Sequence, residues 1–169
     1  MQPTQEISPE QLQDLLKAYR QFVEKEIFPI DLQVVRGPFK QYLPQLKALR
    51  KQAKSLGLFA PHLSKNEGGL GLNLLQFAHV SEILGQSPIG HYVFNCAAPD
   101  IGNMELLHQF GSEEQKAKWL GPLQRGEIRS CFAMTEPDFA GSNPVNMATT
   151  AVVDGEDYLI NGHKWFTTA

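Results

Sequence analysis

The spacing of apolar residues changes near Gly126, and this change limits the folds open to the chain. Before Gly126, apolar residues recur every three or four positions, as on one face of a helix. After it, residues 128–135 alternate in character, which is the spacing of a β-strand. The sequence therefore predicts an α+β chain, with an all-α helical bundle over residues 1–127 and the first strands of an antiparallel sheet or barrel over residues 128–169.

Residues typical of helix ends divide the first part of the chain. Ser8 followed by Pro9, with Gln11 three residues after Ser8, predicts a capped helix start. Pro29 is expected to end this first helix, because proline breaks the backbone hydrogen-bond ladder. Gly57 is expected to close a second helix over residues 43–56.

Three further helices are expected in the bundle. Residues 74–84 are apolar on most of their surface, so a buried helix is predicted there. Another helix should run from about Pro99 to Phe110 and stop at Gly111. The last should begin at a second capping box, at Ser112.

Two glycine turn signals lie in the second part of the chain. Asp154-Gly155 and Asn161-Gly162 predict consecutive hairpins joining strands over residues 149–153, 158–160 and 164–167. A sheet of about four strands is expected to begin here. An apolar strand without a following element is a liability in a finished domain, so we expect the sequence to be a fragment that aggregates through residues 164–168.

Composition excludes several classes of function. The net charge of −3 gives no reason to expect a nucleic-acid partner. We interpret the basic residues as interleaved with acidic ones, so we expect no polybasic patch. Cys96 and Cys131 are 35 residues apart, which favours neither a zinc site nor a disulfide framework. With no secretory signal and no apolar run near the ~20 residues of a membrane span, the sequence favours an intracellular protein, cytoplasmic if bacterial, with an organelle also open.

Three motifs together resemble the acyl-CoA dehydrogenase family. They are FAMTEP at residues 132–137 with GS at 141–142, NGHKWFT at 161–167, and the weaker NEGGLGL at 66–72. Residues 98–107 also resemble the family, especially its larger, kinase-associated members. The resemblance covers nearly the whole chain and implies an N-terminal helical domain, the start of a middle β-barrel domain, and a missing C-terminal helical domain.

The resemblance implies an FAD site on the β part. Small hydroxyl residues and backbone groups suit the polar edge of a flavin, and glycine allows close approach to a phosphate. The residues matched to the family's isoalloxazine wall are Phe132, Met134, Thr135, Trp165, Phe166 and Thr167, with Thr167 near flavin N5. Gly141 and Ser142 match the turn that contacts the pyrophosphate. Taken singly, each of these residues is more often structural; only the joint pattern favours cofactor binding.

Several other residues are not assigned a catalytic or binding role. Glu136 and Asp138 are not taken as catalytic carboxylates, because the resemblance implies that the glutamate of this motif shapes the loop and is not the base. Asn143-Pro144 stands where many relatives have an acidic residue, so contacts made by that side chain are not expected. His79 is predicted to be packed in the bundle. No histidine has partners at metal-ligand spacing.

The resemblance implies removal of two hydrogens from an acyl-CoA to give a trans-2-enoyl-CoA. The carboxylate base is expected beyond residue 169, electron-transfer flavoprotein is the expected electron acceptor, and the complete protein is expected to be a homo-oligomer. Residues 87–100 should form part of the acyl-chain wall. Two alternatives stay open: another flavoenzyme on this scaffold (acyl-CoA oxidase, nitroalkane oxidase or flavin monooxygenase), or a non-catalytic remnant that serves as a helical interaction module.

Overall fold

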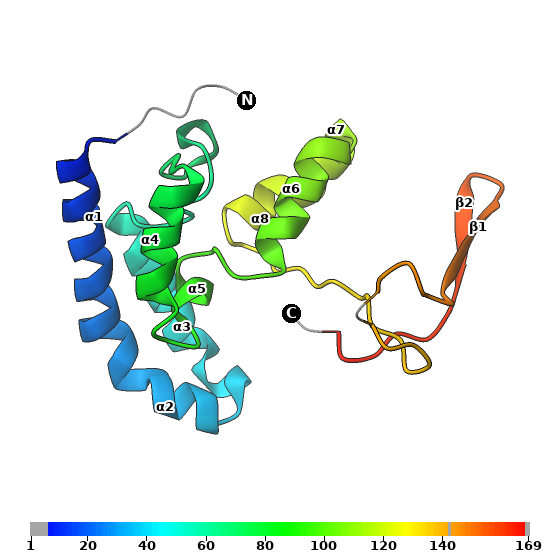
Figure 1. Cartoon of the computed structure of the whole chain (residues 1–169), viewed down its shortest axis with the longest axis horizontal. Coiled ribbons are helices and arrows are strands. Elements are labelled where there is room, and N and C mark those ends of the chain that lie inside the picture. The colour runs from blue at the N-terminus through cyan, green and yellow to red at the C-terminus, as the bar shows by residue number, and fades with distance from the viewer. Residues whose placement is uncertain (1–6, 142, 168–169) are drawn as a thin grey trace.

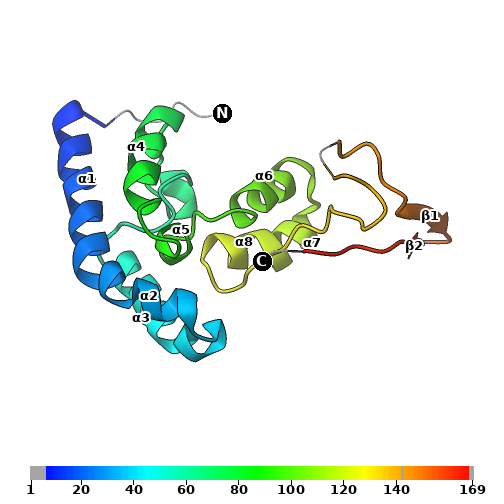
Figure 2. The ribbon, with the colours of Figure 1, turned by 60° about the horizontal axis from the view of Figure 1, so that its bottom comes forward.

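The computed structural model describes residues 7–141 and 143–167. Helices make up one part of the molecule, and a two-stranded hairpin extends away from them, as both Figure 1 and Figure 2 show. The predicted order of a helical bundle followed by β structure is confirmed. No helix in the described ranges is both long and apolar enough to cross a membrane.

The first helix begins as predicted but continues past its proline. Helix α1 (Pro9–Phe22) starts at a reciprocal capping box between Ser8 and Gln11. A π-helical turn, η1 (Val23–Ile27), leads directly into α2 (Phe28–Arg36). The prediction that Pro29 ends the helix was wrong: Pro29 lies in the first turn of α2, where a missing N–H leaves few intrahelical bonds unmade.

The next two helices are α3 (Phe39–Ser55) and α4 (Leu74–Leu84). As predicted, a glycine follows the end of α3, with Gly57 at φ +69°. A short 3-10 turn, η2 (Lys65–Glu67), interrupts the loop between them. The burial predicted for α4 holds only toward its C-terminus, since Leu74 and Leu75 in its first turn are 85% and 69% exposed.

The helical segments after α4 complete the bundle. They are α5 (Gly90–Val93), α6 (Asp100–Phe110), α7 (Glu113–Gln115), the π-helical η3 (Lys116–Leu120) and α8 (Gly121–Gln124). The capping box predicted at Ser112 is confirmed. Helix α6 ends at Gly111, also as predicted.

An aromatic cluster lies at the centre of the core. The ring of Phe94 makes edge-to-face contacts with Tyr19 and Phe22, at centroid distances of 5.0 and 5.1 Å. The Tyr19 hydroxyl donates to the Leu58 carbonyl oxygen at 2.6 Å, so its one polar atom is satisfied inside the core. This cluster joins α1 to the loop after α3 and to the segment after α5.

One of the two predicted hairpins is present. Strands β1 (Thr150–Asp154) and β2 (Asp157–Asn161) pair antiparallel, with Val152 opposite Leu159. Gly155 adopts φ +65° in the connecting turn, as the sequence indicated.

The second hairpin and the first strand were predicted wrongly. Asn161 still pairs with Thr150, and the chain then runs extended past Thr149. A Cβ at Gly162 would lie 2.1 Å from Thr149 Oγ1, so this glycine permits a close passage and not a turn. Residues 128–135 and 162–167 are not strands, because among the described residues a single backbone bond, Trp165 N–H to Thr135 O at 3.1 Å, joins them.

Candidate functional site

A buried carboxylate joins three segments of the β part. Glu136 is 3% exposed and accepts hydrogen bonds from the amides of Ala148 and Thr149, at 2.6 and 2.9 Å. It also accepts from Lys164 Nζ at 2.8 Å, and the same ammonium donates to the Met134 carbonyl oxygen at 2.9 Å. We call Glu136, Lys164 and the two amides the Glu136 node. It fixes the FAMTEP segment against residues 164–166.

The hydrogen bonds of this node hold the pKa of Glu136 down to about 2. The bond from Lys164 is the largest cause, followed by the bonds from Thr149 and Ala148. Glu136 is therefore ionised at neutral pH, and it shapes the loop as expected from the sequence.

Three of the predicted site residues meet beside the node. The Trp165 amide donates to the Thr135 carbonyl oxygen at 3.1 Å. Gly141 adopts φ +74°, and a Cβ added there would lie 3.6 Å from Thr135 Cγ2. The turn at Gly141 therefore lies within van der Waals reach of Thr135, and its left-handed backbone favours glycine. The predicted residue Ser142 lies outside the described residues.

Aromatic side chains next to the node are open to solvent. Phe132, Trp165 and Phe166 are 55%, 42% and 80% exposed. The Trp165 and Phe166 rings lie 4.8 Å apart and are tilted by 50°. Neighbouring exposed rings of this kind mark a surface that an apolar, planar partner can cover. Thr167 follows them and is also exposed, whereas Met134 is half-buried.

A second cluster anchors the start of the FAMTEP segment to α6. Asp100, which is 2% exposed, accepts from the Ser130 amide at 2.8 Å, from Ser130 Oγ at 2.7 Å, and from Arg129 Nε. Asn103 Nδ2 donates to Ser130 Oγ at 2.9 Å and to the Cys131 carbonyl oxygen at 3.1 Å. These bonds fix the residues directly before Phe132.

Sequence reasoning missed both clusters. Lys164 lies 28 residues from Glu136, and Asp100 lies 30 residues from Ser130. Neither pair has a characteristic spacing, so the sequence held no signal for them beyond the rarity of buried acids.

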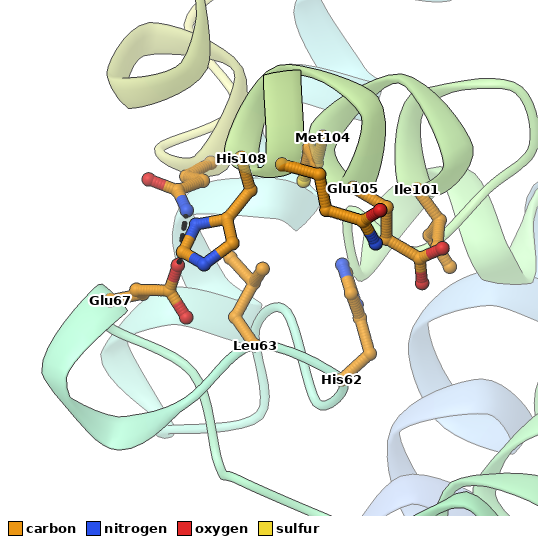
Figure 3. Close-up of a pocket in the computed structure, with 9 residues that line it drawn as sticks. His62, Leu63, Glu67, Ile101, Met104, Glu105 and His108 are labelled. Carbon is orange, nitrogen blue, oxygen red and sulfur yellow. Dashed lines mark hydrogen bonds and ion pairs between the residues drawn. The ribbon is translucent and has the colours of Figure 1, made fainter. Parts of the chain in front are cut away.

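A separate pocket of about 370 Å³ lies between α6 and the loop that joins α3 to α4 (Figure 3). In it Glu67 accepts from Gln124 Nε2 at 2.8 Å and lies 3.7 Å from His108 Nδ1. Burial lowers the pKa of His62 to about 4, and its ring nitrogens have no hydrogen-bond partner among the described residues. None of the predicted site residues lines this pocket.

The described residues contain no group of three or more His, Cys, Asp or Glu that could hold a metal ion. One histidine prediction was wrong: His79 is exposed, because it lies on the outward face of α4 and not against the core. Asn143 begins a turn, in which its side-chain Oδ1 accepts a hydrogen bond from the Val145 amide at 3.3 Å.

Comparison with known proteins finds matching family models for both the helical part and the β part of the chain. Residues 9–127 match the model of the acyl-CoA dehydrogenase N-terminal domain, and residues 131–169 match that of the acyl-CoA dehydrogenase middle domain. Acyl-CoA dehydrogenase family member 10 of Mus musculus is 40% identical over 96% of this chain, which spans 16% of that protein.

Solved structures of acyl-CoA dehydrogenases are also similar to this chain. A putative acyl-CoA dehydrogenase from Mycobacterium abscessus superposes with a TM-score of 0.84 and 40% identity, covering 96% of this chain and 43% of its own. A glutaryl-CoA dehydrogenase from Mycobacterium smegmatis, solved in complex with FADH2, gives a TM-score of 0.64 and 29% identity, covering 92% of this chain and 38% of its own. The chain thus spans less than half the length of these relatives, and on both family models it belongs to the acyl-CoA dehydrogenase family.

Proposed function

We propose that this chain forms one wall of the FAD site, and part of the acyl-CoA site, of a flavin-dependent enzyme that converts an acyl-CoA to a trans-2-enoyl-CoA. Family membership supports this reading, and one structural relative was solved with FADH2. We assign residues 1–127 to the helical domain and residues 128–169 to the beginning of the β domain.

The observation that carries the proposal is the Glu136 node. It holds two segments side by side, so that Thr135 lies beside Trp165 and exposed rings flank them. This arrangement fits an isoalloxazine ring, which offers broad apolar faces and a polar edge. Gly141, with positive φ and no Cβ, fits the close backbone approach that a pyrophosphate requires.

Each residue on this wall has a distinct proposed role. Phe132, Trp165 and Phe166 would cover the ring and exclude water from it. Thr135 and Thr167 would offer hydroxyl groups to its polar edge, with Met134 between the wall and the node. Gly141 and Ser142 would hold the pyrophosphate. When bound, the flavin supplies the acceptor for the hydride that leaves the β-carbon of the substrate.

The α-proton requires a base, and Glu136 is unsuited to this role. Its carboxylate already accepts three hydrogen bonds, and its pKa is about 2, far below the range of an effective base at neutral pH. We therefore propose that the base is a carboxylate outside residues 1–169. Electron-transfer flavoprotein as acceptor, homo-oligomeric assembly and an intracellular location belong to the same proposal.

An FAD titration of the full-length gene product, followed by flavin fluorescence, tests the wall. Trp165→Ala should weaken FAD binding by about tenfold, the loss expected when a ring contact worth ~1.4 kcal/mol is removed. Trp119→Ala is a matched control, because Trp119 is similarly exposed (46% against 42%) but lies on η3. Equal affinities for the two variants would show that the flavin does not contact this wall.

The reaction itself is tested on the full-length gene product. Anaerobic addition of an acyl-CoA should bleach the bound flavin, and the colour should return slowly in air. Rapid return with formation of hydrogen peroxide would identify an oxidase.

A further inference from the structure

Charge is unevenly distributed along the chain. Residues 32–66 contain seven Lys and Arg and no Asp or Glu, although the whole chain has a net charge of −3. The remaining residues therefore carry a net charge of −10. The expectation that basic and acidic residues are interleaved, with no polybasic patch, was wrong for this segment.

Four of these cations lie on one face of α3. Lys47, Arg50, Lys51 and Lys54 follow the spacing i, i+3, i+4 and i+7, which aligns side chains along a helix. Together with Gly126 and Glu127 they line a hollow of about 300 Å³. We call this hollow the α3 groove.

Arg50 forms the floor of the α3 groove and is held rigidly. It is 7% exposed, and its guanidinium donates to Asn95 Oδ1 at 2.8 Å, to the Gly126 carbonyl oxygen at 3.3 Å and to the Tyr92 carbonyl oxygen. The rings of Phe59 and Tyr92 lie 5.2 and 5.0 Å from it. The guanidinium is thus preorganised by neutral groups. Burial lowers the pKa of Arg50, but a guanidinium stays protonated in a protein.

Carboxylates offset only part of the positive charge of this groove: Glu127 lies in its lining, and its charge raises the pKa of Lys54 against the larger lowering by burial and Arg50. Asp100, whose charge also acts on Arg50, is ion-paired with Arg129. Glu127 forms two hydrogen bonds with Arg125, at 2.8 and 3.0 Å. Lys47, Lys51 and Lys54 form no ion pair with any residue in the described part of the chain.

The cations also act on one another. The pKa of Lys54 is lowered, first by burial and then by the charge of Arg50. An anion in the groove would relieve this repulsion. Its binding would therefore be coupled to the charges of Lys54 and Arg50.

We propose that the α3 groove binds the phosphate or diphosphate group of a small molecule. Arg50 below, Lys54 held by the Arg125 carbonyl oxygen and the Phe59 ring, and the exposed Lys47 and Lys51 at the rim are groups that phosphates prefer. A buried floor favours a small ligand over a flat protein surface. The groove shares no residue with the proposed flavin wall, so the two sites are independent.

Isothermal titration of the full-length gene product with inorganic pyrophosphate, at low ionic strength, tests the proposal. Binding should saturate with one site per chain and weaken as salt is added. Lys51→Glu should weaken it by about tenfold, because the substitution replaces attraction with repulsion at contact distance. Lys17→Glu makes the same charge change at an exposed position on α1 and should alter affinity by less than about twofold.

Two further measurements identify the source of the phosphate and distinguish the α3 groove from the proposed flavin wall. ADP should compete with pyrophosphate if a nucleotide supplies the phosphate, and should fail to compete if the groove takes inorganic phosphates alone. Trp165→Ala should leave pyrophosphate binding unchanged even where FAD binding is lost. The proposal would be overturned if a protein with a helical circular dichroism spectrum showed no saturable binding at millimolar pyrophosphate. It would also be overturned if Lys51→Glu and Lys17→Glu weakened pyrophosphate binding equally.

Discussion

Replacing Asp100 by alanine should detach the FAMTEP segment from α6. The carboxylate is 2% exposed and accepts three hydrogen bonds from two consecutive residues, Arg129 and Ser130. Ser130 is two residues from Phe132, the first residue of the proposed flavin wall. A loss of these bonds therefore acts on stability and on the position of the wall together.

The magnitude follows from the number and burial of the bonds. A hydrogen bond to a charged group contributes about 1.5–3 kcal/mol, and removal of one partner of a buried pair costs about 3–5 kcal/mol. The Arg129 side chain is 28% exposed and can turn to water, so the lower end applies, about 3 kcal/mol for Asp100→Ala. Asp100→Asn keeps an oxygen for Ser130 and loses the ion pair, so about 1.5 kcal/mol is expected.

Urea unfolding followed by circular dichroism measures the loss in stability, and hydrogen exchange at the Ser130 amide reports the local release. Asp14→Ala, at an exposed position on α1, should change the free energy of unfolding by less than ~0.5 kcal/mol. In a double-mutant cycle, Arg129→Met should lower the free energy of unfolding by less in the Asp100→Ala background than in the wild-type protein. A loss below ~1 kcal/mol for Asp100→Ala, with Ser130 still protected, would refute this account of the anchor.

Three further predictions concern glycine geometry and acid sensitivity. Gly126→Ala should lower the free energy of unfolding by more than ~2 kcal/mol, since φ is +65° there and the new Cβ would lie 2.3 Å from Arg50 Nη2. Gly155→Ala has the same φ but open space around it, so it should lower the free energy of unfolding by about 1 kcal/mol. Urea unfolding of the two variants measures the difference. The pKa of His62 is lowered to about 4, so unfolding becomes easier as pH falls from about 6.5 to 4, and His62→Gln should flatten this part of a stability–pH profile. Glu136 stabilises the fold above about pH 4.5 and loses this contribution as pH falls toward its pKa of about 2; Glu136→Gln should therefore be less stable than wild type at pH 7 and equally stable near pH 2.

Features set by neighbours in the sequence were predictable. The capping box at Ser8 depends on a residue three positions away, and the β1–β2 turn depends on the freedom of Gly155. The continuation past Pro29 was not predictable, because it depends on a π-helical turn in which five residues shift their hydrogen bonds together. The Asn161-Gly162 turn signal was misleading, since that glycine is required by the close passage of Thr149.

Contacts between residues far apart in the sequence could not be predicted from local patterns. The motifs identified Thr135 and Trp165 separately, but their hydrogen bond depends on a chain path that no local pattern specifies. The cationic face of α3 is the opposite case. The spacing of Lys47, Arg50, Lys51 and Lys54 was visible in the sequence, and a helical projection of charge would have revealed it.

The Glu136 node explains why a conspicuous acid in the best-matched motif is structural. A general base needs a free lone pair and a pKa near the working pH. Glu136 Oε1 accepts from Lys164 and Thr149, and Oε2 accepts from Ala148. The same bonds that depress its pKa are those that position Thr135 beside Trp165, so a basic Glu136 would require a disassembled wall. If the proposed function holds, positioning the flavin and abstracting the proton are therefore tasks for different carboxylates.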